Sequence, residues 1–135
     1  MAVEMSGTYT GGLKMELRHA PSGATLATAA PRDNLGDGSS FSPTDLLAAS
    51  LGSCMVTTMA IVAQREGIAF EGASFSLEKH MRSDPRRVDA VPVRIHLPAS
   101  LGEAQRRKLE NAALTCPVHR SLHPDIRKDV EFVYE

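Results

Sequence analysis

The strongest constraint on the fold is an apolar stretch that runs from Leu46 to Ala63. The motif Ser42-Pro43-Thr44-Asp45 precedes it and is typical of a helix start, with Ser42 as the N-cap and Asp45 placed to return a hydrogen bond to that cap. Gly67 is suited to end the helix. Because this predicted helix is apolar nearly all round, it needs cover on every side and is expected to be a central core helix.

Length alone would allow the same stretch to cross a membrane. It is rich in Ala, Ser, Thr and Gly, which contribute little to insertion, so no membrane contact is expected. The N-terminal residues lack the charged and apolar regions of a signal peptide, and we expect a cytoplasmic location. The 15 basic and 16 acidic side chains balance, which gives no electrostatic footprint for nucleic acid.

Apolar and polar residues alternate on both sides of the central helix and predict strands. The expected strands cover approximately residues 3–10, 13–18 and 24–29 before the helix, and 75–81, 91–97 and 130–134 after it. Gly11-Gly12 supplies the first hairpin turn, and Pro92 suggests an edge or a bulge. Short connections favour antiparallel pairing with helices on one face. We therefore predict an α+β fold, with an antiparallel sheet packed on the long helix, in a single domain of residues 1–135.

A second helix is predicted between the last two strands. Ser100–Glu103 has the form of a capping box. One side of the helix that follows is apolar: Leu101, Ala104, Leu109, Ala112 and Ala113. Pro117 interrupts this helix directly after Cys116 and begins a short helical turn that extends to Leu122.

The chain has two cysteines, and they occupy unlike settings. Cys54 lies inside the long helix, whereas Cys116 stands at the start of a short one. Disulfides seldom serve a structural purpose in a reducing cytoplasm, so the pair suggests redox chemistry. The alternative is that both are inert, buried cysteines.

The two thiols differ in what their own segments offer them. A thiol at a helix N-terminus faces unpaired N–H groups and the positive end of the helix dipole, which favours the thiolate of Cys116. His119 and Arg120 add donor or cationic character within one turn. Cys54 lies mid-helix, where burial disfavours a thiolate, and it needs a cation or donor from another segment.

Metal binding is a third possibility. Cys116, His119 and His123 follow the spacing C-x2-H-x3-H, and the two histidines have the i,i+4 separation of helical zinc ligands. Pro124 shortens the helix, however, and a fourth ligand would have to be distant in sequence. A three-ligand match this local is a weakly specific sign of a zinc site.

These motifs resemble the OsmC/Ohr family of osmotically inducible and organic hydroperoxide resistance thiol peroxidases. The resemblance rests on the segment 42–49 leading to Gly52-Ser53-Cys54, and on the segment 116–122. It implies an intertwined homodimer in which antiparallel sheets wrap two long central helices. It also implies that Cys54 is the peroxidatic cysteine and that Cys116 resolves it. A dithiol, lipoyl groups in the best-known branch, would recycle the disulfide, and no metal or organic cofactor would be needed.

The chain departs from the family pattern at two positions. In the peroxidase branches a glutamate follows the helix-opening proline and orients an arginine against the reactive thiol, but here that position is Thr44, with Asp45 next. The organic hydroperoxide resistance branch has an arginine after the glycine pair of the first hairpin, where this chain has Leu13. The candidate activating cations are Arg32, in the loop before the helix, Arg120, and an arginine of the partner chain.

The resulting hypothesis is a two-cysteine thiol peroxidase that reduces organic hydroperoxides in oxidative-stress defence. Besides the two cysteines, the candidate activating or substrate-contacting residues are Arg32, Thr44, Asp45, His119 and Arg120. The alternatives are an OsmC-like, non-catalytic module that binds an apolar small ligand at the dimer interface, and a zinc-binding module.

Overall fold

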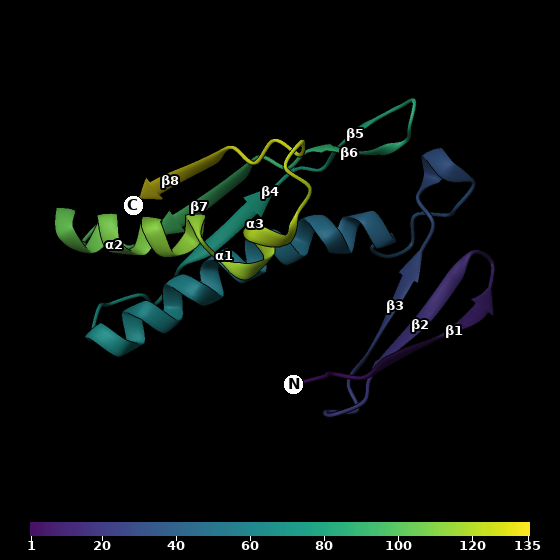
Figure 1. The fold of residues 1–135 in the computed structure, drawn as a ribbon, viewed down its shortest axis with the longest axis horizontal. Coiled ribbons are helices and arrows are strands. Elements are labelled where there is room, and N and C mark those ends of the chain that lie inside the picture. The colour runs from purple at the N-terminus through teal and green to yellow at the C-terminus, as the bar shows by residue number, and fades with distance from the viewer. The chain divides into compact units, whose positions relative to one another are not determined.

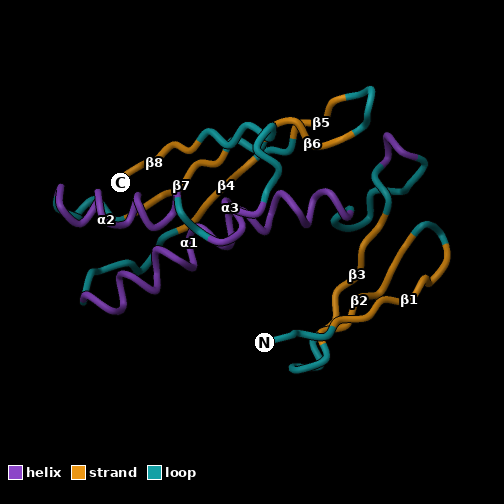
Figure 2. The backbone as a smooth tube through the Cα atoms, viewed as in Figure 1, coloured by secondary structure: helices purple, strands orange, loops and turns teal.

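The computed structural model describes all 135 residues. The chain divides into two compact units, residues 1–47 and 48–135. Their boundary falls in the first turns of the long helix α1 (Pro43–Glu66). Strands and helices are both present in the order shown in Figures 1 and 2, so the predicted α+β class is confirmed. The assignment of the whole chain to one domain stays a prediction.

Unit 1 contains a three-stranded antiparallel sheet. Its strands are β1 (Met5–Gly11), β2 (Lys14–His19) and β3 (Thr25–Ala29), paired in that order. Gly11, Gly12 and Leu13 all have positive φ in the turn between β1 and β2, which is the backbone that a tight hairpin requires. The three strands predicted before the helix are therefore confirmed. A single 3-10 turn, η1 (Arg32–Asn34), follows them.

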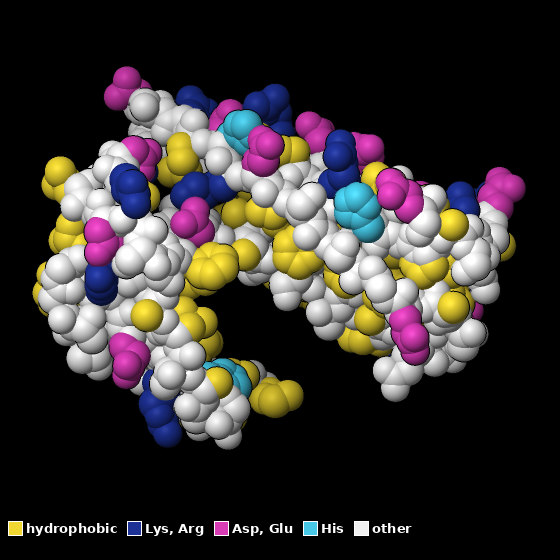
Figure 3. Space-filling model, turned by 180° about the vertical axis from the view of Figure 1, so that it is seen from behind, with side chains coloured by type: hydrophobic (Ala, Val, Ile, Leu, Met, Phe, Trp, Pro, Cys, Tyr) yellow, Lys and Arg dark blue, Asp and Glu magenta, His cyan; other side chains and the backbone are white.

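One face of this sheet is apolar and is not buried by unit 1 itself. Register places Leu17 between Gly7 of β1 and Leu26 of β3, and side chains two residues away along each strand share that face. Met5 is 71% exposed, Tyr9 61% and Leu26 48%. A hollow of about 430 Å³ lies over part of this face. Figure 3 shows exposed hydrophobic side chains in yellow on one side of the molecule.

The α1 helix begins and ends at the signals that the sequence carries. The Asp45 N–H donates to Ser42 Oγ (3.1 Å), and the Ser42 N–H donates to Asp45 Oδ2 (2.8 Å), which completes the predicted capping box. At the other end Gly67 has φ +66°, and the Ile68 N–H donates to the Ala63 carbonyl at 2.8 Å. The α1 helix is long and apolar enough to span a membrane. The core helices of soluble proteins meet the same criteria of length and composition.

Unit 2 contains two small sheets. One has the order β4 (Ser74–Leu77), β7 (Val93–Leu97), β8 (Val130–Tyr134), and the other pairs β5 (His80–Arg82) with β6 (Arg87–Ala90). The prediction of one continuous strand over 75–81 was wrong, because these residues belong to two strands, β4 and β5, in different sheets. The strand predicted over 91–97 begins only at Val93. Pro92 lies between β6 and β7, where the chain passes from one sheet to the other, and proline has no N–H to donate. The Pro92 carbonyl still accepts from the Glu78 N–H at 3.2 Å.

The direction of β8 is a second correction. β4 pairs with β7 antiparallel, as does β5 with β6, but β8 runs parallel to β7. The helices α2 (Glu103–Leu114) and α3 (Pro117–Ser121) lie between these two strands in sequence. They form the crossover that a parallel pair needs, which a prediction based on short turns did not consider.

The start of α2 also differs from its prediction. The N-cap is Gly102 rather than Ser100, and the Gly102 N–H donates to the side chain of Gln105 at 3.1 Å. Leu109, Ala112 and Ala113 are buried as expected. Ala104, in contrast, is exposed, because at about 100° per residue it lies about 140° around the helix from Leu109 and off the buried face.

The core of unit 2 forms around α1. Leu51, Met55 and Met59 are fully buried and recur every four residues, so they lie on one stripe of the helix. They join a cluster that includes Ile95 of β7 and Leu109 of α2. This stripe fixes the rotation of α1, and with it the direction in which the neighbouring Cys54 projects.

Candidate active site

Cys54 lies on α1 beside the buried stripe and is half-buried. Thr58, one helical turn later, contacts it in two ways. Its hydroxyl donates to the Cys54 carbonyl oxygen at 2.8 Å, and the same Oγ1 lies 3.9 Å from Cys54 Sγ. The thiol is free. Cys54 therefore presents a reduced sulfur atom with a hydroxyl group from its own helix next to it.

Cys116 occupies the N-cap of α3, as the sequence predicts, and its side chain is 0% exposed. Pro117 starts α3 and prevents α2 from continuing, so the chain turns at Thr115 and Cys116. The backbone N–H of His119 donates to Cys116 Sγ at 3.3 Å. The sulfur atom thus takes the capping role that an oxygen atom has in most helices.

The fold brings the two cysteines together. Their side chains interact electrostatically, and no disulfide joins the two thiols. Burial raises the pKa of Cys116, while the N–H of His119 acts in the opposite direction. The interaction with Cys54 raises the Cys116 pKa further. Cys116 is therefore held as a protonated thiol at neutral pH, beside a second thiol.

This raised pKa gives a testable pH dependence. In a Cys54→Ser variant, where Cys116 is the one remaining thiol, we expect iodoacetamide to label native Cys116 much more slowly at neutral pH than a free thiol. Because only the thiolate reacts and burial favours the thiol, labelling is expected to accelerate above the pH at which an ordinary cysteine ionises. The measurement is the labelling rate over a pH series, with urea-unfolded protein as the control. Equal profiles in the two states would contradict this account.

Two other predicted residues belong to α3. The Arg120 side chain donates from Nε to the Thr115 carbonyl at 3.1 Å, so it satisfies the C-terminal end of α2. His119 is half-buried, and burial, followed by the charge of Lys128, lowers its pKa. A neutral imidazole is therefore favoured at neutral pH. His119 contributes its backbone N–H to Cys116, whereas the recorded contact of Arg120 is structural.

The remaining predicted residues belong to unit 1. Thr44 Oγ1 lies 3.2 Å from Ser42 Oγ, and Asp45 completes the cap of α1. Arg32, in η1, donates from Nε to the Asp37 carbonyl at 3.2 Å. Hydrogen bonds from Ser39 and Lys14 lower the pKa of Asp37 to about 2, so its carboxylate stays charged beside Lys14. The roles proposed for Arg32, Thr44 and Asp45 stay predictions.

The metal-binding alternative gains no support from the geometry. His123 Nδ1 accepts the Asp125 N–H at 3.1 Å and lies 3.3 Å from a guanidinium nitrogen of Arg87. The Nδ1 atom of His123 therefore faces hydrogen-bond donors from both Asp125 and Arg87. No group of three or more His, Cys, Asp or Glu side chains is arranged to hold a metal ion.

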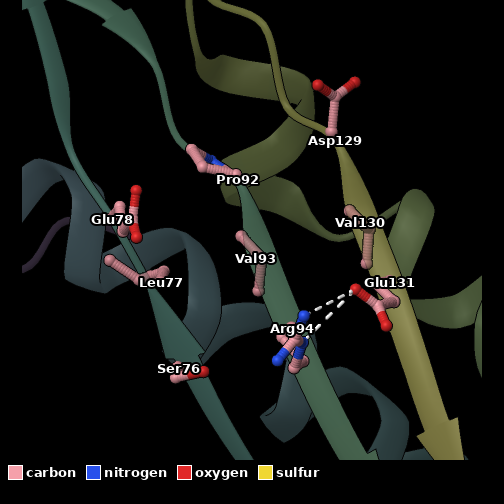
Figure 4. A pocket seen from close by; sticks show the side chains of 9 residues that line it. All are labelled: Ser76, Leu77, Glu78, Pro92, Val93, Arg94, Asp129, Val130 and Glu131. Atoms are coloured by element: carbon pink, nitrogen blue, oxygen red, sulfur yellow. Dashed lines mark hydrogen bonds and ion pairs between the residues drawn. The ribbon is translucent and has the colours of Figure 1, made fainter.

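The sequence did not predict a hollow of about 460 Å³ on the sheet of unit 2. It is lined by Ser76, Leu77, Glu78, Pro92, Val93, Arg94, Asp129, Val130 and Glu131. Figure 4 shows that Arg94 of β7 reaches across to Glu131 of β8, and the two form an ion pair at 3.1 Å. No nucleophilic thiol lines this hollow, which separates it from the candidate active site.

Thr58 is a residue near the thiol of Cys54 that the sequence analysis did not include in the candidate site. It shares a helix face with Cys54, but it was not among the candidate site residues. Its i,i+4 spacing was the available signal, because residues four apart on a helix are neighbours. With Thr58 included, the candidate active site of unit 2 consists of Cys54, Thr58, Cys116 and the N–H of His119.

Fold and site together define an α+β protein whose central helix carries a free thiol in contact with a second thiol at a helix N-cap. The chain belongs to the OsmC-like protein family, whose model matches residues 36–131. The resemblance seen in the sequence is therefore confirmed. A search of curated proteins finds no match.

Solved structures agree with this assignment. A protein of Psychrobacter arcticus 273-4, provisionally named for osmotic stress induction and a detoxification response, is 42% identical, with a TM-score of 0.91 over 95% of this chain and 93% of that one. The organic hydroperoxide resistance protein OsmC of Legionella pneumophila is 20% identical, with a TM-score of 0.77 over 98% and 97%. OhrB of Bacillus subtilis, an organic hydroperoxide resistance protein, is 15% identical, with a TM-score of 0.70 over 98% of each chain. The last two show the fold alone.

Proposed function

We propose that this protein reduces organic hydroperoxides by a two-cysteine mechanism and serves in defence against oxidative stress. The observation that carries the proposal is that the free thiol of Cys54 on the central helix interacts with the buried thiol of Cys116 at the α3 N-cap. Membership of the OsmC-like family supports it. Structural relatives named for organic hydroperoxide resistance are consistent with it.

The chemistry begins at Cys54. Its thiolate attacks the outer oxygen of the hydroperoxide, the O–O bond breaks, and the alkoxide leaves as an alcohol after it takes a proton. Cys54 is oxidised to a sulfenic acid in this step. Cys116 then loses its proton and attacks Cys54 Sγ, so that an S–S bond forms and the sulfenic oxygen leaves as water.

The interactions of Cys116 suit a resolving thiol. While Cys54 is ionised, its negative charge keeps Cys116 protonated, which prevents two thiolates from facing each other. Oxidation of Cys54 to the neutral sulfenic acid removes that Coulombic contribution. The N–H of His119 remains to stabilise the Cys116 thiolate, so the second step is favoured after the first.

The cycle closes with an external dithiol, proposed to be of the lipoyl type. Its thiolate attacks the Cys54–Cys116 disulfide, and its second thiol displaces the mixed disulfide to release both cysteines reduced. No metal or organic cofactor takes part in this scheme. The candidates for the cation that activates Cys54 are Arg32, Arg120 and an arginine of the partner chain. We propose that the protein works in the cytoplasm, where reduced dithiols are available.

We also propose that the working form is a homodimer. The exposed apolar face of the unit 1 sheet supports this, because Met5, Tyr9 and Leu26 would each contact water in a lone chain. A second copy of the chain would bury this face. The alternative function, a non-catalytic module for an apolar ligand, is favoured by the hollow of about 430 Å³ on the same face.

The test measures consumption of cumene hydroperoxide by the purified protein with dihydrolipoamide as reductant, after sedimentation has established the expected dimer. We expect turnover with the wild-type protein, and the disulfide after peroxide alone. The Cys116→Ser variant is expected to consume one equivalent of hydroperoxide per chain and then stop. Its Cys54 would be trapped as a sulfenic acid that dimedone labels. Wild-type protein whose thiols survive excess peroxide would refute the peroxidase, and the apolar-ligand alternative would take its place.

A further inference from the structure

Thr58 has a position that the proposed chemistry does not yet use. Its Oγ1 lies 3.9 Å from Cys54 Sγ and 2.8 Å from the Cys54 carbonyl oxygen. It is half-buried on α1, whereas its neighbour Thr57 is exposed. A hydroxyl group is thus held next to the thiol by the helix that carries the thiol.

The hydroxyl has one proton, and that proton has two possible acceptors. When Cys54 is a neutral thiol, the Thr58 hydroxyl donates its hydrogen bond to the Cys54 carbonyl oxygen. This carbonyl also accepts the helical N–H of Thr58, four residues later, so the hydroxyl supplies only its second hydrogen bond. Loss of the second bond leaves the carbonyl satisfied and costs little.

The preferred acceptor of the Thr58 hydroxyl changes when the Cys54 thiol becomes a thiolate. A thiolate is a charged acceptor, and hydrogen bonds to charged groups are about twice as strong as neutral ones. Rotation of the Thr58 hydroxyl then moves its proton from the carbonyl to Sγ, with the side chain in place. Cys116, from α3, also faces Cys54, and burial keeps it protonated.

We propose that Thr58 is a positioning residue whose hydroxyl switches from the Cys54 carbonyl to the Cys54 thiolate and stabilises the reactive form of the thiol. The inference rests on the proposed function for its purpose, because a stabilised thiolate matters where Cys54 is the nucleophile. Its physical content concerns the thiolate alone. Alkylation can therefore test it without any hydroperoxide.

The experiment measures the alkylation rate of Cys54 by iodoacetamide over a pH series, in a Cys116→Ser background that leaves one thiol. Thr58→Val keeps the shape of the side chain and removes the hydroxyl. We expect it to slow alkylation at neutral pH about tenfold and to shift the profile to higher pH. The rate at the alkaline plateau is expected to stay unchanged, because every thiol is ionised there. Thr58→Ser is expected to retain the parent profile.

Thr57→Val is the matched control, since it makes the same change on the exposed neighbouring position. If the Thr58→Val profile coincides with that of Thr57→Val, the proposal is wrong. If Thr58→Ser slows alkylation as much as Thr58→Val, the methyl group matters rather than the hydroxyl, and the proposal is equally wrong. Thr58→Ala serves if the valine variant does not fold, with circular dichroism as the check.

These outcomes stay separate from the fate of the proposed function. A shifted alkylation profile with no hydroperoxide turnover would support the role of Thr58 at the thiolate and refute the peroxidase. Turnover by the parent protein with unchanged Thr58→Val alkylation would support the peroxidase and refute the role of Thr58. Running both assays on the same preparations distinguishes the two.

Discussion

Replacing Cys54 by serine is expected to abolish hydroperoxide reduction, with a loss of turnover of at least about three orders of magnitude. A serine hydroxyl is not ionised at neutral pH and is not oxidised to a sulfenic acid, so no step of the cycle has a substitute. The fold should persist, because the buried stripe of α1 does not include Cys54. The measurement is steady-state turnover of cumene hydroperoxide with dihydrolipoamide, together with an unfolding curve.

Cys116→Ser is the natural comparison, since it removes the partner thiol and leaves the proposed nucleophile. It is expected to lose steady-state turnover but to react once with hydroperoxide, whereas Cys54→Ser should not react at all. If the single reaction instead survives in Cys54→Ser and disappears in Cys116→Ser, the two roles are reversed. Because Cys116 is fully buried, such a reversal would also require the short helix α3 to open.

Replacing Gly52 by valine is expected to destabilise the protein strongly, by about 3 kcal/mol. A Cβ atom at this position would lie 2.4 Å from the ring of Phe75 and 3.0 Å from a methyl carbon of Leu77. The absence of a side chain at Gly52 therefore allows α1 to lie directly on β4. The measurement is the free energy of unfolding in urea, at one fixed protein concentration because a dimer would couple stability to concentration.

Ser53→Val is the matched control, because Ser53 is the next residue on α1 and is exposed. It is expected to cost less than about 1 kcal/mol, as a β-branched residue in a helix. Phe75 is 36% exposed, so Phe75→Ala should relieve much of the clash, and the double variant should be more stable than the sum of the single changes predicts. Equal losses for Gly52→Val and Ser53→Val would show that the close approach does not limit the packing.

The parts of the fold that the sequence predicted depend on local signals. The N-cap at Ser42 and the stop at Gly67 follow from the chemistry of a few neighbouring residues. The hairpin at Gly11-Gly12 needs only positive φ. These preferences act over one turn of chain, and tertiary contacts did not override them.

The two errors in the sheets arise from information that is not local. Pro92 marked an irregularity, but residues 75–81 and 91–97 alternate without a break, and the division between two sheets depends on how the strands pair. The direction of β8 depends on the crossover through α2 and α3. The predicted order of strand, helix and strand was itself the signal for a parallel pair, and it was outweighed by the short turns elsewhere.

The candidate site was predicted in composition and only partly in geometry. Both cysteines were identified from their settings, yet sequence spacing could not establish that Cys54 and Cys116 touch. That contact depends on the rotation of α1, which Leu51 and Met55 fix, and on the position of α3. Helical spacing placed Thr58 on one stripe with Cys54, but a threonine four residues from a cysteine is common. The distance of 3.9 Å between Thr58 Oγ1 and Cys54 Sγ is what makes Thr58 part of the site.

The parallel pairing of β7 with β8 also determines when the thiol pair can exist. Cys116 lies in the crossover between these strands, and each residue of β7 pairs with one far later in the chain. Pairs so distant in sequence form late, because the intervening chain must first be ordered. We therefore expect the contact between Cys54 and Cys116 to form only after β7 and β8 have paired, since that pairing closes the crossover that carries Cys116.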